Sequence, residues 1–266
     1  MSVSATLAKT RADGRAALVG YLPAGFPTVD DSIAAIKTMI DSGCDVVEVG
    51  LPYSDPVMDG PAIQRAAETA LAAGTRTRDV LRVVETVAGA GAPILVMTYW
   101  NPVEKYGVDA FARDLAGAGG TGLITPDLIP EEADEWLAAS DAHDLDRVFL
   151  VAPSSTEERI ARTVAVTRGF VYAQSIMGVT GARDRTSTAA PALVERTRAA
   201  TDLPIGVGLG VRDGAQAAEV ASYADAVIVG SAMVSRLLDA ETLAAATASL
   251  HTLTADLASG VRTARP

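Results

Sequence analysis

Two carboxylates stand in one short stretch of this sequence, among neighbours that are apolar or turn-forming. The stretch reads CDVVEVGLPYSDPVMDGPAIQ and covers residues 44–64. Glu48 lies inside the apolar run 46–51, and Asp59 follows it in a segment rich in Pro and Gly. A carboxylate among apolar neighbours has a raised pKa, because desolvation disfavours its charged form, and a raised pKa suits a general acid or base. Glu48 is therefore a candidate for proton transfer; the alternative is a strand residue that faces solvent or an ion-pair partner.

The two aspartates of the same stretch have simpler explanations available. Asp59 precedes a glycine, and an Asp-Gly pair is an ordinary turn signal or the N-cap of a helix that begins near Pro61. Asp55 precedes Pro56, a pairing that is typical of a turn. From the residues alone, both aspartates stay open between a structural and a functional role.

Three glycine-bearing stretches form a second group of interest. They read SIMGVTGARDRTST (175–188), GVGLGVRDG (206–214) and VGSAMV (229–234). The backbone N–H groups of such loops, and of a helix that begins in one, bind anions without a lysine. The first stretch has charges and hydroxyls but few apolar residues, so it fits either a plain surface loop or a mobile lid. The other two fit either tight turns or a phosphate site.

The elements that must position these residues alternate between short apolar runs and longer amphipathic segments. The runs are rich in β-branched residues, and the segments carry apolar residues at helical spacing. The expected strands are 17–24, 45–52, 93–99, 122–127, 147–153, 169–175, 203–210 and 225–232. The expected helices are 29–43, 61–74, 79–91, 109–119, 131–140, 156–167, 190–201 and 214–224.

This alternation predicts an α/β fold with a parallel sheet, because each parallel crossover needs a helix. Eight such units in 266 residues match a (β/α)8 TIM barrel of one domain, 1–266, with a leading helical segment over about 1–16. An open doubly wound sheet is the second choice, but no G-x-G-x-x-G motif follows the first expected strand. The glycine-bearing stretches follow the sixth, seventh and eighth expected strands. Since the loops after the strands carry function in a barrel, we predict a phosphate site there.

Composition disfavours several classes of function. Asp and Glu number 33 against 22 Lys and Arg, and the net charge of −11 argues against nucleic-acid binding. No apolar run approaches the roughly 20 residues of a membrane span, and no signal peptide is expected. Cys44 is the single cysteine, so an intrachain disulfide is impossible and a cytoplasmic location is expected. His143 and His251 have no metal-site spacing around them, so no metal is predicted.

Several motifs, taken together and in chain order, resemble the α subunit of tryptophan synthase. They read VVEVGLPYSDPVMDGPAIQ, LVMTYWNP, GLITPDLIPEE, GVTGARD, VGLGVRD and VIVGSAMV, and the match runs from about residue 17 to 240. The first motif is highly specific, whereas the glycine motifs are shared with other phosphate-binding barrels. The resemblance implies a carbon–carbon lyase of L-tryptophan biosynthesis. Its reaction is the cleavage of indole-3-glycerol phosphate to indole and glyceraldehyde 3-phosphate.

The resemblance also implies roles for the two carboxylates. Glu48 matches the family's catalytic acid/base, which moves protons as the carbon–carbon bond breaks. Asp59 matches the second catalytic carboxylate, which stabilises the indole N–H when the ring becomes positively charged. By the same match, the phosphate site comprises Gly181, Gly210, Gly230 and Ser231, and the substrate or indole pocket comprises Tyr21, Met97, Ile124, Tyr172, Thr180 and Leu209.

The family works as an αββα assembly with a pyridoxal-phosphate β subunit, which receives indole through a tunnel. The resemblance therefore implies no cofactor in this chain and a β-subunit partner, with Pro52 and Asp55 at the contact. Three alternatives stay open. One is a free-standing indole-3-glycerol-phosphate lyase that needs no partner. The second is a non-catalytic subunit that binds a phosphorylated sugar, and the third is a sugar-phosphate isomerase of the same fold.

Overall fold

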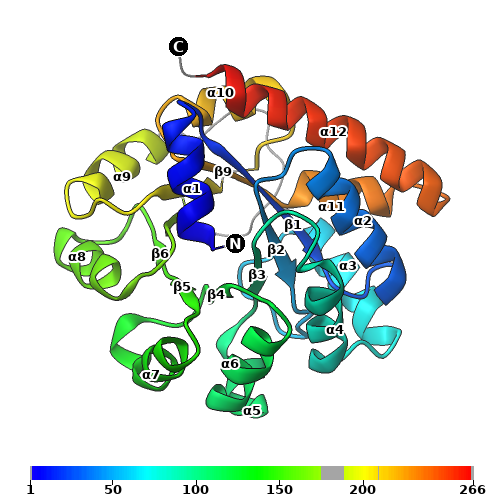
Figure 1. Cartoon of the computed structure of the whole chain (residues 1–266), viewed down its shortest axis with the longest axis horizontal. Coiled ribbons are helices and arrows are strands. Elements are labelled where there is room, and N and C mark those ends of the chain that lie inside the picture. Colours follow the sequence, from blue (N-terminus) through cyan, green and yellow to red (C-terminus); the bar gives the residue numbers. More distant parts are fainter. Residues whose placement is uncertain (1, 175–188, 209, 265–266) are drawn as a thin grey trace.

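The strands form one parallel sheet that closes into a barrel. The computed structural model describes residues 2–174, 189–208 and 210–264. Within these ranges the strand order is β5-β4-β3-β2-β1-β9-β8-β7-β6, and the paired neighbours are parallel. Figure 1 views the barrel along its axis, with helices around it. The strands are β1 (Ala17–Pro23), β2 (Val46–Gly50), β3 (Ile94–Met97), β4 (Gly122–Ile124), β5 (Asp146–Val148), β6 (Leu150–Val151), β7 (Val171–Gln174), β8 (Ile205–Gly208) and β9 (Ala226–Val229).

The two ends of this strand order belong to one extended segment. Only Phe149 separates β5 from β6, and the Phe149 carbonyl accepts a hydrogen bond from the Tyr172 N–H on β7. β5 pairs with β4 on one side and β6 pairs with β7 on the other, so the segment joins the sheet to itself. Each of the expected strands is present, the fifth of them interrupted at Phe149, and the TIM-barrel prediction is confirmed.

Helices follow the strands and pack on the outside of the barrel, as the alternation predicts (Figure 1). A short 3-10 turn, Pro130–Glu132, precedes α7. The helices are α1 (Val3–Ala12), α2 (Val29–Asp41), α3 (Pro61–Ala72), α4 (Thr77–Val87), α5 (Trp100–Tyr106), α6 (Val108–Gly117), α7 (Asp134–Ala142), α8 (Glu157–Val166), α9 (Ala189–Arg198), α10 (Gly214–Ala221), α11 (Ser231–Leu238) and α12 (Leu243–Thr263).

Three helices, α5, α11 and α12, lie outside the expected helix ranges. No helix was expected directly after β3, but α5 begins there at Trp100. Pro102 is tolerated there because it lies in the first turn, where the N–H groups have no intrahelical acceptor. α12 was not expected at all, although Leu250, Leu253 and Leu257 follow helical spacing and are buried.

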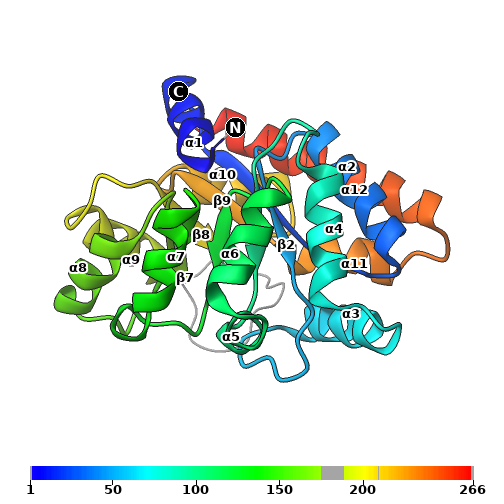
Figure 2. The same ribbon diagram turned by 60° about the horizontal axis from the view of Figure 1, so that its bottom comes forward.

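The apolar core has an inner and an outer part. The inner part fills the barrel and includes Val46, Leu95 and Ile124 from three different strands, and Phe170 just before β7. Val3 and Leu7 of α1 join this inner cluster. Figure 2 shows α1 at one end of the barrel, with α3 and α5 towards the other. α1 therefore closes the end at which the strands begin, and the opposite end, where the strands finish, is left to the loops that carry the expected site. The outer part lies between the strands and the surrounding helices.

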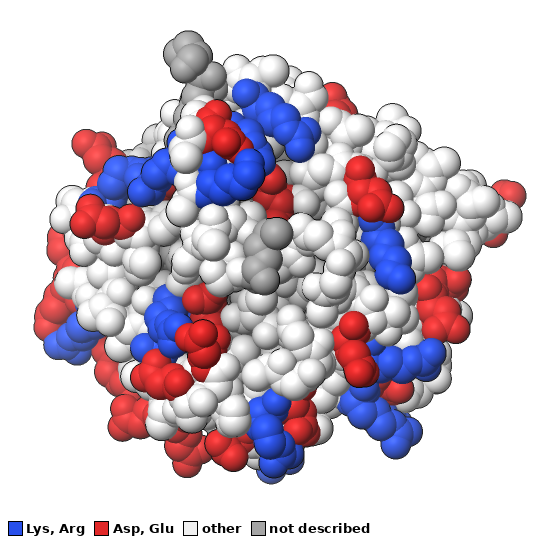
Figure 3. Space-filling view, in the orientation of Figure 1, with Lys and Arg blue, Asp and Glu red and all other residues white. Residues whose placement is uncertain are grey.

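Charged side chains of both signs are interspersed on the face covered by α1 (Figure 3). Several of the basic side chains here are paired: Arg15 forms a two-bond pair with Asp45, and Arg11 and Arg198 both contact Asp225. Asp45 also accepts the Leu18 N–H at 2.9 Å. The Arg15–Asp45 pair ties the starts of β1 and β2 together, and Asp225 links α1 and α9 to the start of β9. None of the helices in the described ranges has the length and apolar character that crossing a membrane requires.

Candidate active site

Glu48 points into the barrel. It lies on β2 two residues after Val46, which belongs to the inner cluster, and alternate residues of a strand face the same side. Its Cα pairs in register with Tyr21 on β1 and Leu95 on β3. The residue is only 1% exposed, so the solvent-facing alternative is wrong. Among the described residues, no basic side chain forms an ion pair with it, and its Oε1 has no hydrogen-bond partner there.

The environment of Glu48 gives its carboxyl properties that suit proton transfer. Burial raises its pKa from 4.5 to about 8, because the charged form loses its hydration. Near neutral pH such a group is mostly protonated, yet it gives up its proton at little cost. A buried polar atom without a partner destabilises a fold, and Oε1 is such an atom within the described part of the chain. The raised pKa and the lack of a partner for Oε1 among the described residues are both properties expected of a group that exchanges protons with a bound ligand.

Asp59 lies in the loop between β2 and α3 and is half-buried. The N-cap explanation for it is wrong, because Gly60 occupies the N-cap of α3 and no side chain caps that helix. Gln64 Nε2 donates to the Asp59 carbonyl at 2.7 Å, and the Tyr99 hydroxyl donates to Oδ1 at 3.1 Å. Burial raises the pKa of Asp59, and the hydrogen bond from Tyr99 opposes that rise.

Tyr21 connects the two carboxylates. Desolvation raises its pKa well above the ordinary value, and the charges of Asp59 and then Glu48 raise it further. The pKa of Tyr172 is also raised well above its ordinary value by desolvation, with a contribution from Glu48. Electrostatic coupling of this kind acts between groups a few ångströms apart. Glu48 and Asp59 thus both act on the Tyr21 phenol, and Glu48 also acts on Tyr172.

Two contributors to this arrangement were not predicted from the sequence. Tyr99, which ends the stretch after β3, is 5% exposed and contacts Asp59 through its hydroxyl. Asp127, after β4, accepts the Trp100 N–H with both carboxylate oxygens, at 2.9 and 3.1 Å. The signal that could have found Asp127 is a carboxylate at the carboxyl end of an expected strand. The signal for Tyr99 is weaker, because its partner is distant in sequence.

Gly210, Gly230 and Ser231 lie at the ends of neighbouring strands. β8 and β9 pair in parallel register, Gly210 follows the first of them and Gly230 the second. Gly210 has a φ of 75°, a conformation that favours glycine. Gly230 is the N-cap of α11, and Ser231 begins that helix. The first N–H groups of a helix have no intrahelical acceptor and carry partial positive charge, so this end of α11 is suited to a phosphate.

The described residues of the expected indole pocket also come together. Ile124 belongs to the inner cluster, and Met97 and Tyr172 pack against it as partly buried side chains. Met97 and Ile124 are register partners on β3 and β4. On β8, Gly208 leaves room for the Tyr172 side chain. A Cβ at Gly208 would lie 2.4 Å from the Tyr172 hydroxyl oxygen. These side chains give an apolar surface beside the two carboxylates.

Three of the expected site residues, Gly181, Thr180 and Leu209, lie outside the described residues. Of the two residues expected at a subunit contact, Pro52 is buried within this chain and Asp55 is exposed. The Ser54 hydroxyl donates to Asp55 at 2.6 Å.

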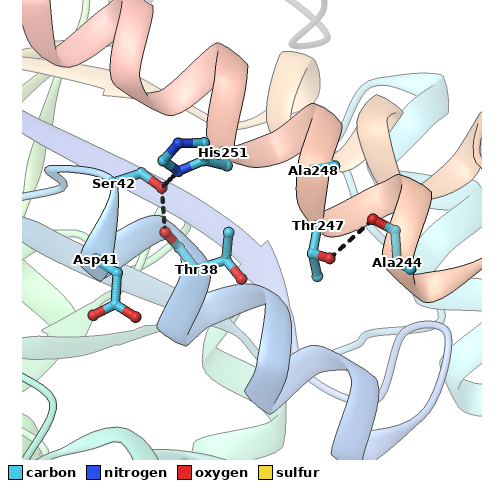
Figure 4. Close-up of a pocket in the computed structure, with 7 residues that line it drawn as sticks. All are labelled: Thr38, Asp41, Ser42, Ala244, Thr247, Ala248 and His251. Atoms are coloured by element: carbon cyan, nitrogen blue, oxygen red, sulfur yellow. Dashed lines mark hydrogen bonds between the residues drawn. The ribbon is translucent and has the colours of Figure 1, made fainter.

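A separate depression lies on the outer surface between α2 and α12 (Figure 4). Its lining includes Ser42 and His251, whose Oγ and Nδ1 atoms are 2.7 Å apart, and none of the expected site residues. Within the described ranges, no group of three or more His, Cys, Asp or Glu side chains is placed to hold a metal ion.

Comparison with known proteins decides the family. The family model described as tryptophan synthase alpha chain matches residues 7–262. The chain belongs to the tryptophan synthase alpha chain family. It is 64% identical over 258 residues to the tryptophan synthase alpha chain of Salinispora tropica, with 97% of both chains covered. It is also 64% identical over 261 residues to that of Thermobifida fusca, again with 97% of both chains covered.

Solved structures of tryptophan synthase agree with the fold. A structure of Mycobacterium tuberculosis tryptophan synthase superimposes with a TM-score of 0.92 at 60% identity and 98% coverage of both chains. The tryptophan synthase alpha subunit of Legionella pneumophila superimposes with a TM-score of 0.89 at 32% identity, again with 98% of both chains covered. The tryptophan synthase resemblance seen in the motifs is therefore confirmed, and this alpha chain is a lyase of tryptophan biosynthesis.

Proposed function

We propose that this chain cleaves indole-3-glycerol phosphate to indole and glyceraldehyde 3-phosphate, and that Glu48 and Asp59 carry the reaction. The observation that supports it most strongly is Glu48, a carboxyl buried in an otherwise apolar barrel interior with a pKa raised to about 8. Asp59 and Glu48 both raise the pKa of the Tyr21 phenol, which supports a shared role for the two carboxylates. Family membership supports the choice of substrate, and the burial of the two carboxyls supports their proposed roles.

Glu48 makes both proton transfers. In its protonated form it gives a proton to indole C3, and the ring nitrogen becomes positively charged. When the bond from C3 to the glycerol chain breaks, its electron pair stays on C3 and neutralises the ring. The Glu48 carboxylate then takes the proton of the hydroxyl on the departing carbon, which becomes the aldehyde. Glu48 gives one proton and takes one back, so it ends the cycle protonated and serves first as acid and then as base. A pKa near 8 suits both steps.

Asp59 stabilises the charged intermediate. Its carboxylate accepts a hydrogen bond from the indole N–H, which bears positive charge only between protonation of C3 and cleavage of the bond. An interaction that strengthens as charge develops lowers the barrier rather than merely tightening binding. The half-buried position of Asp59 increases this effect, since the surrounding medium screens the two charges less than bulk water does.

The opposite end of the substrate binds at the loops after β8 and β9. Gly210, Gly230 and Ser231 present backbone N–H groups and the start of α11 to the phosphate, and Gly181 joins them in the proposal. The indole ring lies against Tyr21, Met97, Ile124 and Tyr172, with Thr180 and Leu209 completing the pocket. Binding both ends of the substrate holds the scissile bond beside Glu48. This positioning lowers the entropic cost of reaching the transition state.

The partner in this proposal is a pyridoxal-phosphate β subunit, to which the indole passes within an αββα assembly. No cofactor is assigned to this chain, whose reaction needs only proton transfers. The exposed side chain of Asp55 is proposed to contact the β subunit, and so is the loop at Pro52, although the Pro52 side chain is buried. The Val57 side chain, 71% exposed in the same loop, adds an apolar surface at this place.

The proposal is tested by steady-state release of indole from indole-3-glycerol phosphate, measured with and without a β subunit. We expect slow release by the chain alone and a marked increase when the β subunit is added. Replacement of Asp55 by Ala should weaken that increase while leaving the isolated chain unchanged. Strong turnover that the β subunit does not alter would favour a free-standing lyase. Binding of the substrate without any indole release would favour a non-catalytic subunit and reject the proposal.

A further inference from the structure

We propose that Tyr99 is a positioning residue for Asp59, and that Asp127 holds Tyr99 in the required place. This inference rests on the proposed function, because it concerns how one of the two reacting carboxylates is aimed. It adds supporting residues to the site: segments that follow β3 and β4 position Asp59, which itself follows the neighbouring strand β2.

The hydroxyl of Tyr99 makes two hydrogen bonds to consecutive residues of the β2–α3 loop. The Met58 N–H donates to the phenol oxygen at 3.0 Å, and the phenol lies 3.1 Å from Asp59 Oδ1. A phenol has a single proton, and an amide N–H can only donate. The phenol proton therefore goes to Asp59, whose oxygen is the acceptor. One side chain thus fixes both the backbone before Asp59 and the direction of its carboxyl.

Tyr99 keeps this donor role across the working range of pH. Its side chain is 5% exposed, and desolvation together with the charge of Asp59 holds the pKa of the phenol well above its usual value. The ring is supported by Tyr53, at 5.2 Å between ring centroids, so a change that keeps the ring also keeps this packing.

Asp127 anchors the backbone that carries Tyr99. Both of its carboxylate oxygens accept the N–H of Trp100, the residue that follows Tyr99 and begins α5. The Tyr99 side chain itself does not cap that helix. On the preceding side, the Thr98 N–H donates to the Ile124 carbonyl at 3.1 Å. The backbone before and after Tyr99 is thus held by β4 and the loop that follows it. This fixes the position from which the Tyr99 side chain extends to Asp59.

The titratable groups near Asp59 indicate how the Tyr99 hydroxyl affects the pKa of Asp59. From β1, the Tyr21 phenol is coupled to Asp59, and Glu48 on β2 is coupled to the same phenol. Burial favours the neutral form of Asp59, and the Tyr99 hydroxyl is the group that opposes this trend. Loss of that hydroxyl should raise the pKa of Asp59 by about 1–2 units, the shift that corresponds to a hydrogen bond to a charged group.

The test uses Tyr99→Phe, which removes the hydroxyl and keeps the ring. Tyr106→Phe is the matched control, because the Tyr106 hydroxyl also donates to a carboxylate, Asp114 Oδ2 at 2.7 Å, but on the exposed side of α6. The pH profile of kcat/KM for indole release is measured for the parent and both variants. A parallel 13C NMR titration follows the Asp59 carboxyl, assigned by its loss in Asp59→Asn.

The expected result is an acidic limb moved to higher pH by about 1–2 units in Tyr99→Phe, together with the same shift in the titration. Tyr106→Phe should coincide with the parent. An unmoved limb and an unmoved titration in Tyr99→Phe would overturn the inference, even if kcat fell uniformly. A parent chain that released no indole would reject the proposed function instead, and the titration would still decide the role of Tyr99.

Asp127→Asn is the second variant, and it keeps the size and one acceptor oxygen of the side chain. The expected result is a smaller shift of the Asp59 titration in the same direction. A titration that coincided with the parent would remove Asp127 from the inference. If Tyr99→Phe does not fold, this variant tests the whole inference: a shifted Asp59 titration supports it, and a titration that coincides with the parent rejects it.

Discussion

The hydroxyl of Tyr21 on β1 lies over Gly50 on β2, two residues after Glu48. A Cβ built at Gly50 would be 2.3 Å from the Tyr21 hydroxyl oxygen and 2.6 Å from Cζ, closer than such contacts allow. Tyr21 is also the register partner of Glu48. The absence of a side chain at Gly50 therefore lets the Tyr21 ring lie across the end of β2, beside the strand that carries Glu48.

Replacement of Gly50 by Ala should displace Tyr21 and impair the reaction. We expect kcat/KM for indole release to fall about 10-fold or more, because small displacements of positioning groups have large effects on rate. Overpacking should also lower the free energy of unfolding by about 1–3 kcal/mol. Gly117→Ala on α6 is the control, since a Cβ there meets nothing within 4 Å. Parent-like kinetics in Gly50→Ala would show that the position of Tyr21 does not matter.

Replacement of Asp59 by Asn should lower kcat with little change in KM. The amide keeps the shape but cannot balance the positive charge on the indole ring, and losses of about 10²- to 10³-fold are usual for such a group. Asp114→Asn is the matched control, because Asp114 also accepts a tyrosine hydroxyl, away from the barrel mouth. Steady-state kinetics measure the effect. A kcat equal to that of the parent would remove Asp59 from the reaction.

Replacement of Gly230 by Ala should weaken substrate binding without weakening the fold. The nearest atom to a Cβ at Gly230 is Tyr21 Cδ1 at 3.4 Å, an ordinary contact, so the free energy of unfolding should stay near that of the parent. A methyl group at the start of α11 would meet the phosphate, and we expect KM to rise about 10-fold, the change that 1.4 kcal/mol of lost binding produces. An unchanged KM, with Gly117→Ala as reference, would place the phosphate elsewhere.

Replacement of Glu48 by Gln should stabilise the fold at high pH. The folded pKa of Glu48 is raised from 4.5 to about 8, so its stabilising contribution is complete below pH 4.5 and is lost as pH rises through 8. Gln has no such dependence. We expect the variant to gain on the order of 3–5 kcal/mol relative to the parent between pH 4.5 and pH 9. Urea unfolding across this range measures the difference, and a constant offset between the two profiles would contradict the raised pKa.

The alternation of runs and amphipathic segments was enough to predict the barrel, because a parallel strand buried on both faces has a simple sequence signal. The interruption of the fifth strand at Phe149 was not predictable, since it reflects how one segment pairs with β4 on one side and β7 on the other. The helix after β3 was missed because its start is stabilised by Asp127, a residue far along the chain.

The candidate site was predictable to different extents for different residues. Glu48 was visible as one charge in an apolar run, and its burial follows from that pattern. Asp59 was ambiguous until Gly60 proved to be the N-cap of α3. Tyr99 could not be found, because it contacts Asp59 across 40 positions of sequence, and the contact depends on the pairing of β2 with β3 and on the path of the long β2–α3 loop.

The most direct measurement is release of indole from indole-3-glycerol phosphate by the parent chain and by Glu48→Gln, with Glu85→Gln as control. Glu85 is exposed on α4, and the same chemical change there should leave release unaltered. If Glu48 makes both proton transfers, Glu48→Gln should lose about 10²- to 10⁴-fold in kcat, because the amide can neither give nor take the proton. Full release by Glu48→Gln would contradict the proposed reaction.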